Sequence, residues 1–335
     1  MTPGPGPRNC LTDVAGIAIG HATDLALASG VTAVLFEAPA VAAVSVLGGA
    51  PGGRELGLLA ADMTVERIDA LVLSGGSAFG LDAAGGVQAM LREMGRGLPA
   101  GGARVPLVPQ AILFDLGNGG DKAWGRFSPY RDLGYAAARA ATAAAAAPLG
   151  SVGAGTGATT ATVQGGLGAA SMITTTGHMV AALVAVNALG APTIGDGRHF
   201  WAAPFEVAAE FGGIGWPASM DAATTLRLKR PAQPGTTIGI VATDAVLTKA
   251  QAARLAVTAQ DGLARAILPA HLPMDGDTIF AAATGRHALD GPAVLAALCH
   301  AATLVLARAV ARGVYAARTL PHAGAQASWH ELFRG

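Results

Sequence analysis

The chain of 335 residues is 52% apolar and carries a formal net charge of zero, with 22 basic and 22 acidic residues. This composition excludes a disordered chain, supplies a sizeable hydrophobic core and, without a basic stripe, argues against nucleic-acid binding. Two cysteines, Cys10 and Cys299, are too few and too far apart for a disulfide framework, so a reducing, cytoplasmic compartment is expected.

The ends of the chain predict no targeting or membrane segment. Residues 1–8 lack the apolar core of a signal peptide. Residues 292–307, a charge-free apolar stretch, are short for a membrane span, so no membrane partner is expected. Because no low-complexity linker or shift in composition divides the chain, a single domain over residues 1–335 is predicted.

In chain order, short apolar runs rich in β-forming residues alternate with segments of helical periodicity. Several of the runs have apolar residues on both faces, as strands in a covered sheet do. Helices on two sides of β structure indicate a layered α/β fold. The expected strands are 17–21, 32–36, 43–47, 70–73, 111–114, 169–176, 179–186, 236–243 and 278–283, and the expected helices are 78–94, 135–147, 249–267 and 292–312.

Two of these helices carry end signals. Thr248 and Gln251 have the spacing of a capping box at the start of the helix 249–267. Pro292 near the start and Gly313 just past residue 312 give the last helix the expected asymmetry of its ends.

The junction between Gly235 and Thr236 joins a proline-containing loop to an apolar run of strand length. It fits an ordinary loop-to-strand boundary. It also fits the bond that a self-cleaving hydrolase cuts, because glycine tolerates a backbone that exposes its carbonyl to the next side chain. Cleavage there would leave Thr236 with a hydroxyl nucleophile and a free α-amino base in one residue.

A set of short motifs in a fixed order supports the second interpretation. From about residue 9 to residue 285 the chain resembles the L-aminopeptidase/D-esterase (DmpA-like) family, which includes β-peptidyl aminopeptidases and nylon-oligomer hydrolases. The motifs are NCLTDVAGIAIGHA at 9–22, LSGGSAFGLDAA at 73–84, VPLVP at 105–109, GAGTGAT at 153–159, GGLG at 165–168, VAVN at 184–187, the segment 234–244 and DGDT at 275–278.

The resemblance implies an αββα four-layer sandwich like that of the N-terminal-nucleophile hydrolases. It implies autoproteolysis into chains 1–235 and 236–335, with Thr236 as the nucleophile. The implied activity is hydrolysis of amide bonds in short peptides, amino-acid amides or ω-amino-acid oligomers, without a cofactor. Members of the family are commonly homotetramers, so self-association is expected.

Three further residues are site candidates. Asn187 ends an apolar run, where an asparagine can bind its own backbone in the next turn; the resemblance instead makes it a donor to the oxyanion. Asp275 and Asp277 form an acidic turn whose two side chains lie on the same side of an extended chain. The resemblance, closest to the nylon-hydrolase branch with its two Asp, places this pair against the nucleophile to orient it and set its pKa.

Two features depart from the family pattern. Many relatives carry lysines between the motifs at 153–159 and 165–168, where this chain has none. Some members use a tyrosine at the oxyanion, and only Tyr130 and Tyr135 lie upstream of Thr236 as candidates. Both departures affect the expected substrate range and rate rather than the reaction class.

Other chemistries find less support. Ser77 lacks the spacing of a nucleophile elbow, the glycine-rich turns lack the phosphate-loop ending, and the eight histidines form no metal-ligand motif. Two alternatives stay open. One is an acyltransferase like the ornithine acetyltransferases, which have a similar fold and also cleave themselves at threonine. The other is an uncleaved, non-catalytic relative.

Overall fold

Most of the structure is built on one hydrogen-bonded network of strands. The structure is a computed structural model that describes residues 4–143, 148–220, 225–229 and 234–334. Within these residues nine strands pair in the order β3-β7-β4-β2-β11-β10-β9-β8, with β1 also paired to β2. The strands are β1 (Ile17–Asp24), β2 (Ser29–Val46), β3 (Gly53–Arg54), β4 (Arg67–Ser74), β7 (Gln110–Ile112), β8 (Gly166–Ile173), β9 (Met179–Asn187), β10 (Thr236–Ala245) and β11 (Thr278–His287), while β5 (Leu98–Ala100) and β6 (Ala103–Val105) form a separate hairpin.

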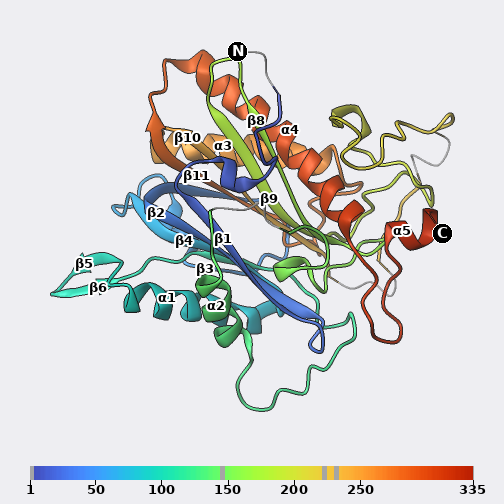
Figure 1. The fold of residues 1–335 in the computed structure, drawn as a ribbon, viewed down its shortest axis with the longest axis horizontal. Coiled ribbons are helices and arrows are strands. Elements are labelled where there is room, and N and C mark those ends of the chain that lie inside the picture. Colours follow the sequence, from blue (N-terminus) through green and yellow to red (C-terminus); the bar gives the residue numbers. More distant parts are fainter. Residues whose placement is uncertain (1–3, 144–147, 221–224, 230–233, 335) are drawn as a thin grey trace.

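The network folds over on itself into two facing layers because β2 belongs to both. Its first part pairs with β1 and β4, its second part pairs with β11, and its register shifts between Leu35 and Ala40. Helices cover the two outer faces, as Figure 1 shows, with α3 and α4 on one side and α1 and α2 on the other. The α-helices are α1 (Ala83–Glu93), α2 (Tyr130–Arg139), α3 (Lys249–Ala264), α4 (Pro292–Ala316) and α5 (Trp329–Phe333).

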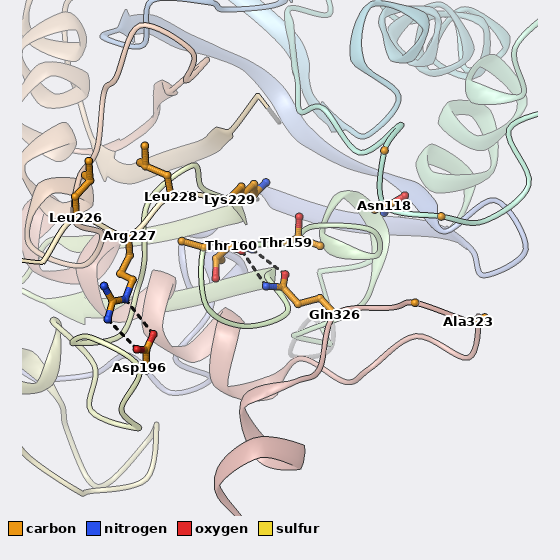
Figure 2. Close-up of a pocket in the computed structure, with 14 residues that line it drawn as sticks. Asn118, Thr159, Thr160, Asp196, Leu226, Arg227, Leu228, Lys229, Ala323 and Gln326 are labelled. Atoms are coloured by element: carbon orange, nitrogen blue, oxygen red, sulfur yellow. Dashed lines mark hydrogen bonds and ion pairs between the residues drawn. The ribbon is translucent and has the colours of Figure 1, made fainter. Parts of the chain in front are cut away.

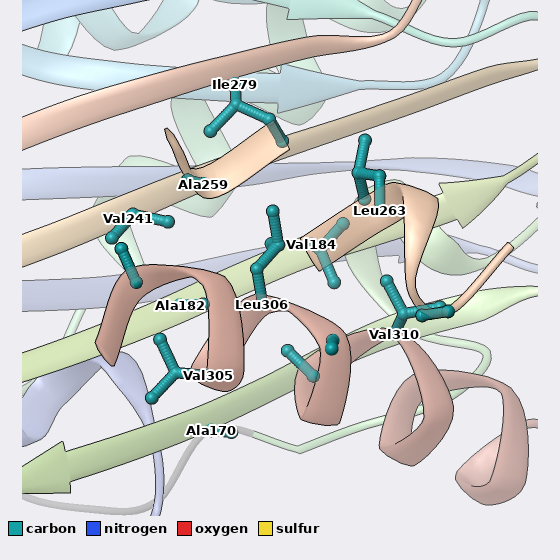
Figure 3. Packing of buried hydrophobic residues seen from close by; sticks show 14 of the residues in the cluster. Ala170, Ala182, Val184, Val241, Ala259, Leu263, Ile279, Val305, Leu306 and Val310 are labelled. Carbon is teal, nitrogen blue, oxygen red and sulfur yellow. The ribbon is translucent and has the colours of Figure 1, made fainter. Parts of the chain in front are cut away.

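Three buried clusters fill the spaces between these four layers. The first lies between α3, α4 and the half-sheet β8–β11, and Figure 3 shows Leu306 and Val310 of α4 beside Val184 of β9. The second lies between the two half-sheets, where Leu73 and Ile240 belong to it. The third lies between the other half-sheet and α1 and α2. The αββα prediction, which the family resemblance implied, is therefore confirmed, and so is the layered α/β arrangement that the two apolar faces of the strands had indicated.

Helix α3 confirms its predicted start. The Thr248 side chain accepts the Gln251 N–H, and the Gln251 side chain in turn accepts the Thr248 N–H. Helix α4 corrects its predicted end, because it continues past Gly313 to Ala316. Gly313 lies inside the helix, where a Cβ would lie 2.9 Å from the Cα of Gly168 in β8. That glycine thus serves close helix–strand contact rather than helix termination.

Two other helix predictions were wrong in position. The predicted helix 78–94 begins as a short 3-10 helix, Ser77–Asp82, and only then becomes α1. The predicted helix 135–147 starts earlier and ends at Arg139, because Thr142 pairs with Ile19 of β1. The last part of that prediction, residues 144–147, lies outside the described residues.

Helix α4 is long and apolar enough to cross a bilayer by length and composition alone, and in the described residues it is the one such helix. Of its most apolar window, 67% is buried inside the protein, against α3, β8 and β9. Its composition is accounted for by this place in the core.

Candidate active site

Thr236 is the first residue of β10, near the middle of the strand network. It pairs with Asn187, the last residue of the antiparallel strand β9, and only 4% of its surface is exposed. Its hydroxyl donates to the carbonyl oxygen of the preceding residue, Gly235. The sequence-predicted strand start is confirmed, and it places a buried hydroxyl against the bond that precedes it.

The acidic turn, which contains Asp275 and Asp277, lies against the junction between Gly235 and Thr236. Gly235 forms a parallel bridge with Asp275, and its carbonyl accepts the N–H of Gly276 at 3.1 Å. Asp277 accepts the N–H of Thr237 at 2.7 Å. Asp275 accepts the N–H groups of Leu189 and Leu272, at 3.2 and 3.1 Å. The two predicted carboxylates are thus brought to the start of β10, as the sequence interpretation requires.

A histidine that sequence reasoning passed over supports Asp277. Both the backbone N–H and the ring Nδ1 of His271 lie within hydrogen-bonding distance of Asp277 Oδ2, at 3.0 and 2.9 Å. Burial alone would lower the pKa of His271, but the hydrogen bond and charge of Asp277 raise it. The pairing holds the carboxylate through Oδ2, whereas Thr237 donates to Oδ1.

Asn187 is fully buried, and its side chain is held by other segments. Its Nδ2 donates to the carbonyl of Phe114 at 2.8 Å, and its Oδ1 accepts the N–H of Thr159 at 3.0 Å. Both partners are distant in sequence, so the interpretation as a residue bound to its own following turn is wrong. The contacts fix the amide in orientation beside Thr236.

Lys229 is the main residue that sequence reasoning missed. Its Nζ donates to the Oδ1 and the backbone carbonyl of Asn187, at 2.8 and 3.0 Å, and its N–H donates to Leu189 at 3.1 Å. The segment between residues 159 and 165 has no lysine, yet an ammonium reaches the site from the loop before Thr236. One signal was available: the chain has only three lysines, so each is an exception in an arginine-rich set of cations.

The buried charges shift one another's protonation. Burial lowers the pKa of Lys229 to about 7, although the negative charges of Asp275 and Asp115 act to raise it. Burial, and then the charge of Asp277, raises the pKa of Asp275 to about 6, while Lys229 lowers it. Two groups close to Thr236 therefore change protonation near neutral pH, as acid–base groups at active sites do.

The two tyrosines differ in place. Tyr130 is buried and donates to Ser29, whose hydroxyl donates to Asp115. Burial raises the pKa of Asp115, which also accepts the Gly76 N–H at 2.7 Å. Tyr135 bonds Glu93 at the exposed surface. Neither hydroxyl has a hydrogen bond to Thr236 or Asn187, so Tyr130 belongs to a buried network that approaches the site through Asp115.

A cavity of about 780 Å³ adjoins this cluster. Thr159 and Lys229, both bonded to Asn187, line it, and Arg227 and Asp196 form a bidentate ion pair at another part of its wall (Figure 2). Gln326, near the C-terminus, closes another side by bonding Thr160. Polar groups thus dominate the cavity. The part of the chain that the structure describes has no group of three His, Cys, Asp or Glu side chains arranged to hold a metal ion.

The four-layer αββα arrangement of helices and sheets is the fold of the N-terminal-nucleophile hydrolases. The chain belongs to peptidase family S58, whose model matches residues 9–327, and it is a hydrolase of that family.

Related sequences and solved structures agree with this family assignment. The chain is 41% identical to an uncharacterized aminopeptidase of Mycobacterium tuberculosis, over 98% of each chain, and 42% identical to one of Mycobacterium leprae, over 83% of this chain and 79% of the relative. In fold it is similar to a β-aminopeptidase of a Burkholderia species, with a TM-score of 0.74, 22% identity and coverage of 98% and 93%. It is also similar in fold to the L-aminopeptidase D-Ala-esterase/amidase of Ochrobactrum anthropi, described as a variant of the Ntn hydrolase fold. That comparison gives a TM-score of 0.71 and 21% identity, and it covers 99% of this chain and 94% of the other.

Proposed function

We propose that the chain is an aminopeptidase that activates itself by cutting its own Gly235–Thr236 bond. The observation that carries the proposal is the contact between the Thr236 hydroxyl and the Gly235 carbonyl, flanked by Asp275 and Asp277. The names of the mycobacterial relatives support the aminopeptidase activity.

In the first reaction, Thr236 Oγ1 attacks the carbonyl carbon of Gly235 and its proton passes to a neighbouring base. The uncut Thr236 has no free amine, so this base must be another residue. Asp275 and Lys229, with pKa values of about 6 and about 7, are suited to the role. Collapse of the intermediate breaks the C–N bond, protonates the leaving nitrogen and leaves an ester, which water hydrolyses to a Gly235 carboxylate and a free Thr236.

In the second reaction, the new α-amine of Thr236, with an ordinary pKa of about 7.7–8.0, accepts the hydroxyl proton as Oγ1 attacks a substrate carbonyl. Asn187 donates from Nδ2 to the oxyanion, a contribution typically worth about 10²–10³ in rate. The substrate amine leaves with the proton, and water then hydrolyses the acyl-enzyme. The acidic pair orients the Thr236 amine and hydroxyl throughout.

The cavity beside Lys229 is the proposed substrate site. In the uncut chain Thr236 is 4% exposed and does not line that cavity. Cutting the bond separates the loop before Thr236 from the strand, which gives the nucleophile a route to the cavity. Its polar walls suit short peptides, amino-acid amides or ω-amino-acid oligomers more than large apolar side chains.

Electrophoresis and N-terminal sequencing test the proposal. The purified protein should separate under denaturing conditions into chains of 235 and 100 residues, the shorter beginning with Thr236. Thr236→Ala should remain a single 33.0 kDa chain and be inactive, because no hydroxyl remains. Thr236→Ser is the matched control: it keeps a hydroxyl and should still be cut. Normal cutting of Thr236→Ala, or a wild-type chain that never cuts, would contradict the proposal.

Substrate assays then separate hydrolysis from transfer. The processed protein should release free amine from amino-acid amides at a rate that an added amino-acid acceptor does not increase. Acyl transfer to the acceptor in excess of hydrolysis would assign it to the acyltransferase class instead.

A further inference from the structure

The carbonyl oxygen of Gly235 has a backbone donor as well as the attacking hydroxyl beside it. The N–H of Gly276 points at this oxygen with an N–O distance of 3.1 Å. When Thr236 Oγ1 attacks, negative charge develops on this same oxygen. A donor already aimed at it stabilises the intermediate without reorganising at the moment of reaction.

The Asp275–Gly276 peptide that supplies this N–H is fixed on several sides. Its carbonyl accepts the N–H of Ala50 at 2.7 Å, so the peptide lies in a chain of hydrogen bonds in which each bond polarises the next. The Asp275 N–H donates to Leu272 at 2.9 Å, and the hydroxyl of Thr278 donates to the carbonyl of Gly276 at 2.9 Å. These contacts hold the donor in place before the reaction starts.

The space around the donor explains why a glycine stands between the two carboxylates. A Cβ on residue 276 would lie 2.8 Å from Thr236 Oγ1 and 2.9 Å from the carbonyl oxygen of Ala50. A side chain would therefore push against the nucleophile itself. Glycine allows the backbone to approach Thr236 closely enough to donate to the bond being cut.

Asn187, the oxyanion donor expected for substrates, is engaged elsewhere. Its Nδ2 donates to the carbonyl of Phe114, and no hydrogen bond joins its side chain to Gly235 in the described residues. The Asn187 side chain and the Gly276 N–H thus donate to different acceptors, the carbonyls of Phe114 and Gly235.

We propose that the backbone N–H of Gly276 is the oxyanion donor for self-cleavage, separate from the Asn187 amide that serves substrates. This inference rests on the proposed self-cleavage and adds the donor that stabilises its intermediate. It also gives the glycine of the acidic turn a catalytic part, beside the two aspartates that flank it.

An amide-to-ester exchange tests the donor directly. In cell-free translation, a suppressor tRNA places either glycine or glycolic acid at position 276; the latter replaces the N–H by an oxygen and adds no bulk. The ester chain should cut itself about 10²–10³-fold more slowly than the glycine chain. The matched control is the same exchange at Gly48, whose N–H donates to the Asp277 carbonyl at 3.2 Å and so holds the same turn without touching Gly235. It should slow cleavage far less.

Each result bears on a different statement. Equal rates for glycine and ester at position 276, or equal losses at positions 276 and 48, would overturn the assignment of this donor while leaving self-cleavage intact. Absence of cleavage in the chain with glycine at 276 would remove self-cleavage itself.

A second measurement does not depend on folding of the ester chain. In the uncut Thr236→Ala protein, the Gly276 amide should be strongly protected from hydrogen exchange by its bond to Gly235. Exchange at the rate of an exposed amide would overturn the proposal.

Discussion

Thr236 has two flanks that differ in how they are built. On one side is the acidic turn, a contiguous stretch whose Asp275 and Asp277 bond the backbone at the start of β10 and its neighbouring loops. On the other side, Asn187 and Lys229 come from separate segments and depend on partners such as Phe114 and Thr159. The first flank is a contiguous motif that can be recognised in the amino-acid sequence. The second exists only once the chain has folded, and it supplies the ammonium that the local motifs lack.

Removing the acidic flank should have the largest effect. Asp275→Asn and Asp277→Asn keep the shape of each side chain but remove its charge. Each variant should therefore fold and cleave itself about 10²–10⁴-fold more slowly than the wild type. Because both act on the same Thr236 hydroxyl, the double substitution should cost much less than the product of the single losses. Cleavage time courses on gels measure this. Wild-type rates in both single variants would reduce the turn to a structural element.

Replacing Lys229 on the other flank tests whether its amine takes part in the reaction or only supports the structure. Lys229→Met should slow self-cleavage by about 10²-fold if the amine exchanges protons in the reaction. Lys249 is the matched control, because it is equally buried but bonds the carbonyls of Leu58, Met63 and Val65. Lys249→Met should lower the melting temperature and leave the rate of the folded protein unchanged. Equal rate losses in both variants would assign Lys229 a structural part only.

The pH dependence sharpens the same comparison. Asp275 becomes a carboxylate above its pKa of about 6, and Lys229 becomes a neutral amine above its pKa of about 7. Both are protonated at pH 5 and both can accept a proton at pH 8, so self-cleavage should accelerate as pH rises across this interval. Precursor purified at pH 5 and shifted to a series of higher pH values allows the measurement. In Lys229→Met only Asp275 remains to titrate, so the rise should follow a single ionisation, and an unchanged profile would exclude the amine as a proton acceptor.

Tyr130 should show the smallest effect on rate. Its hydroxyl donates to Ser29 in the network around Asp115 and has no bond to Thr236. Tyr130→Phe should therefore lower the free energy of unfolding by about 1–3 kcal/mol through the lost buried hydrogen bond, with self-cleavage and turnover nearly unchanged. Denaturant unfolding and a substrate assay measure the two quantities. A large loss of turnover with unchanged stability would instead assign Tyr130 to the oxyanion.

The parts of the fold that could be predicted are those that short-range patterns in the sequence determine. Strand runs with two apolar faces indicated covered sheets, and the Thr248 capping box fixed one helix start. The end of α2 and the position of Gly313 inside α4 could not be predicted in this way, because they depend on a bridge to Ile19 and on a contact with Gly168.

The same division applies to the site. The acidic turn is a motif, whereas the burial of Lys229 depends on the end of β9 more than forty residues earlier. All three lysines of the chain donate to backbone carbonyls, at Leu27, Asn187 and Leu58 among others. In a chain whose other cations are arginines, lysine scarcity was the one usable signal for such positions.

The position of the proposed cut within the strand order has a consequence for folding kinetics. Strands β10 and β11 follow the cut in sequence, yet they lie between β9 and β2, which precede it. The two products of cleavage would therefore be interleaved, and neither could leave without breaking a ladder on each side. Cleavage would leave the strand ladders in place but would change refolding from a unimolecular reaction of one chain to a bimolecular reaction of two. Once unfolded, the processed protein would lose the effective concentration that the intact peptide bond had supplied. Its working lifetime would then be governed by how slowly it opens rather than by how well it refolds.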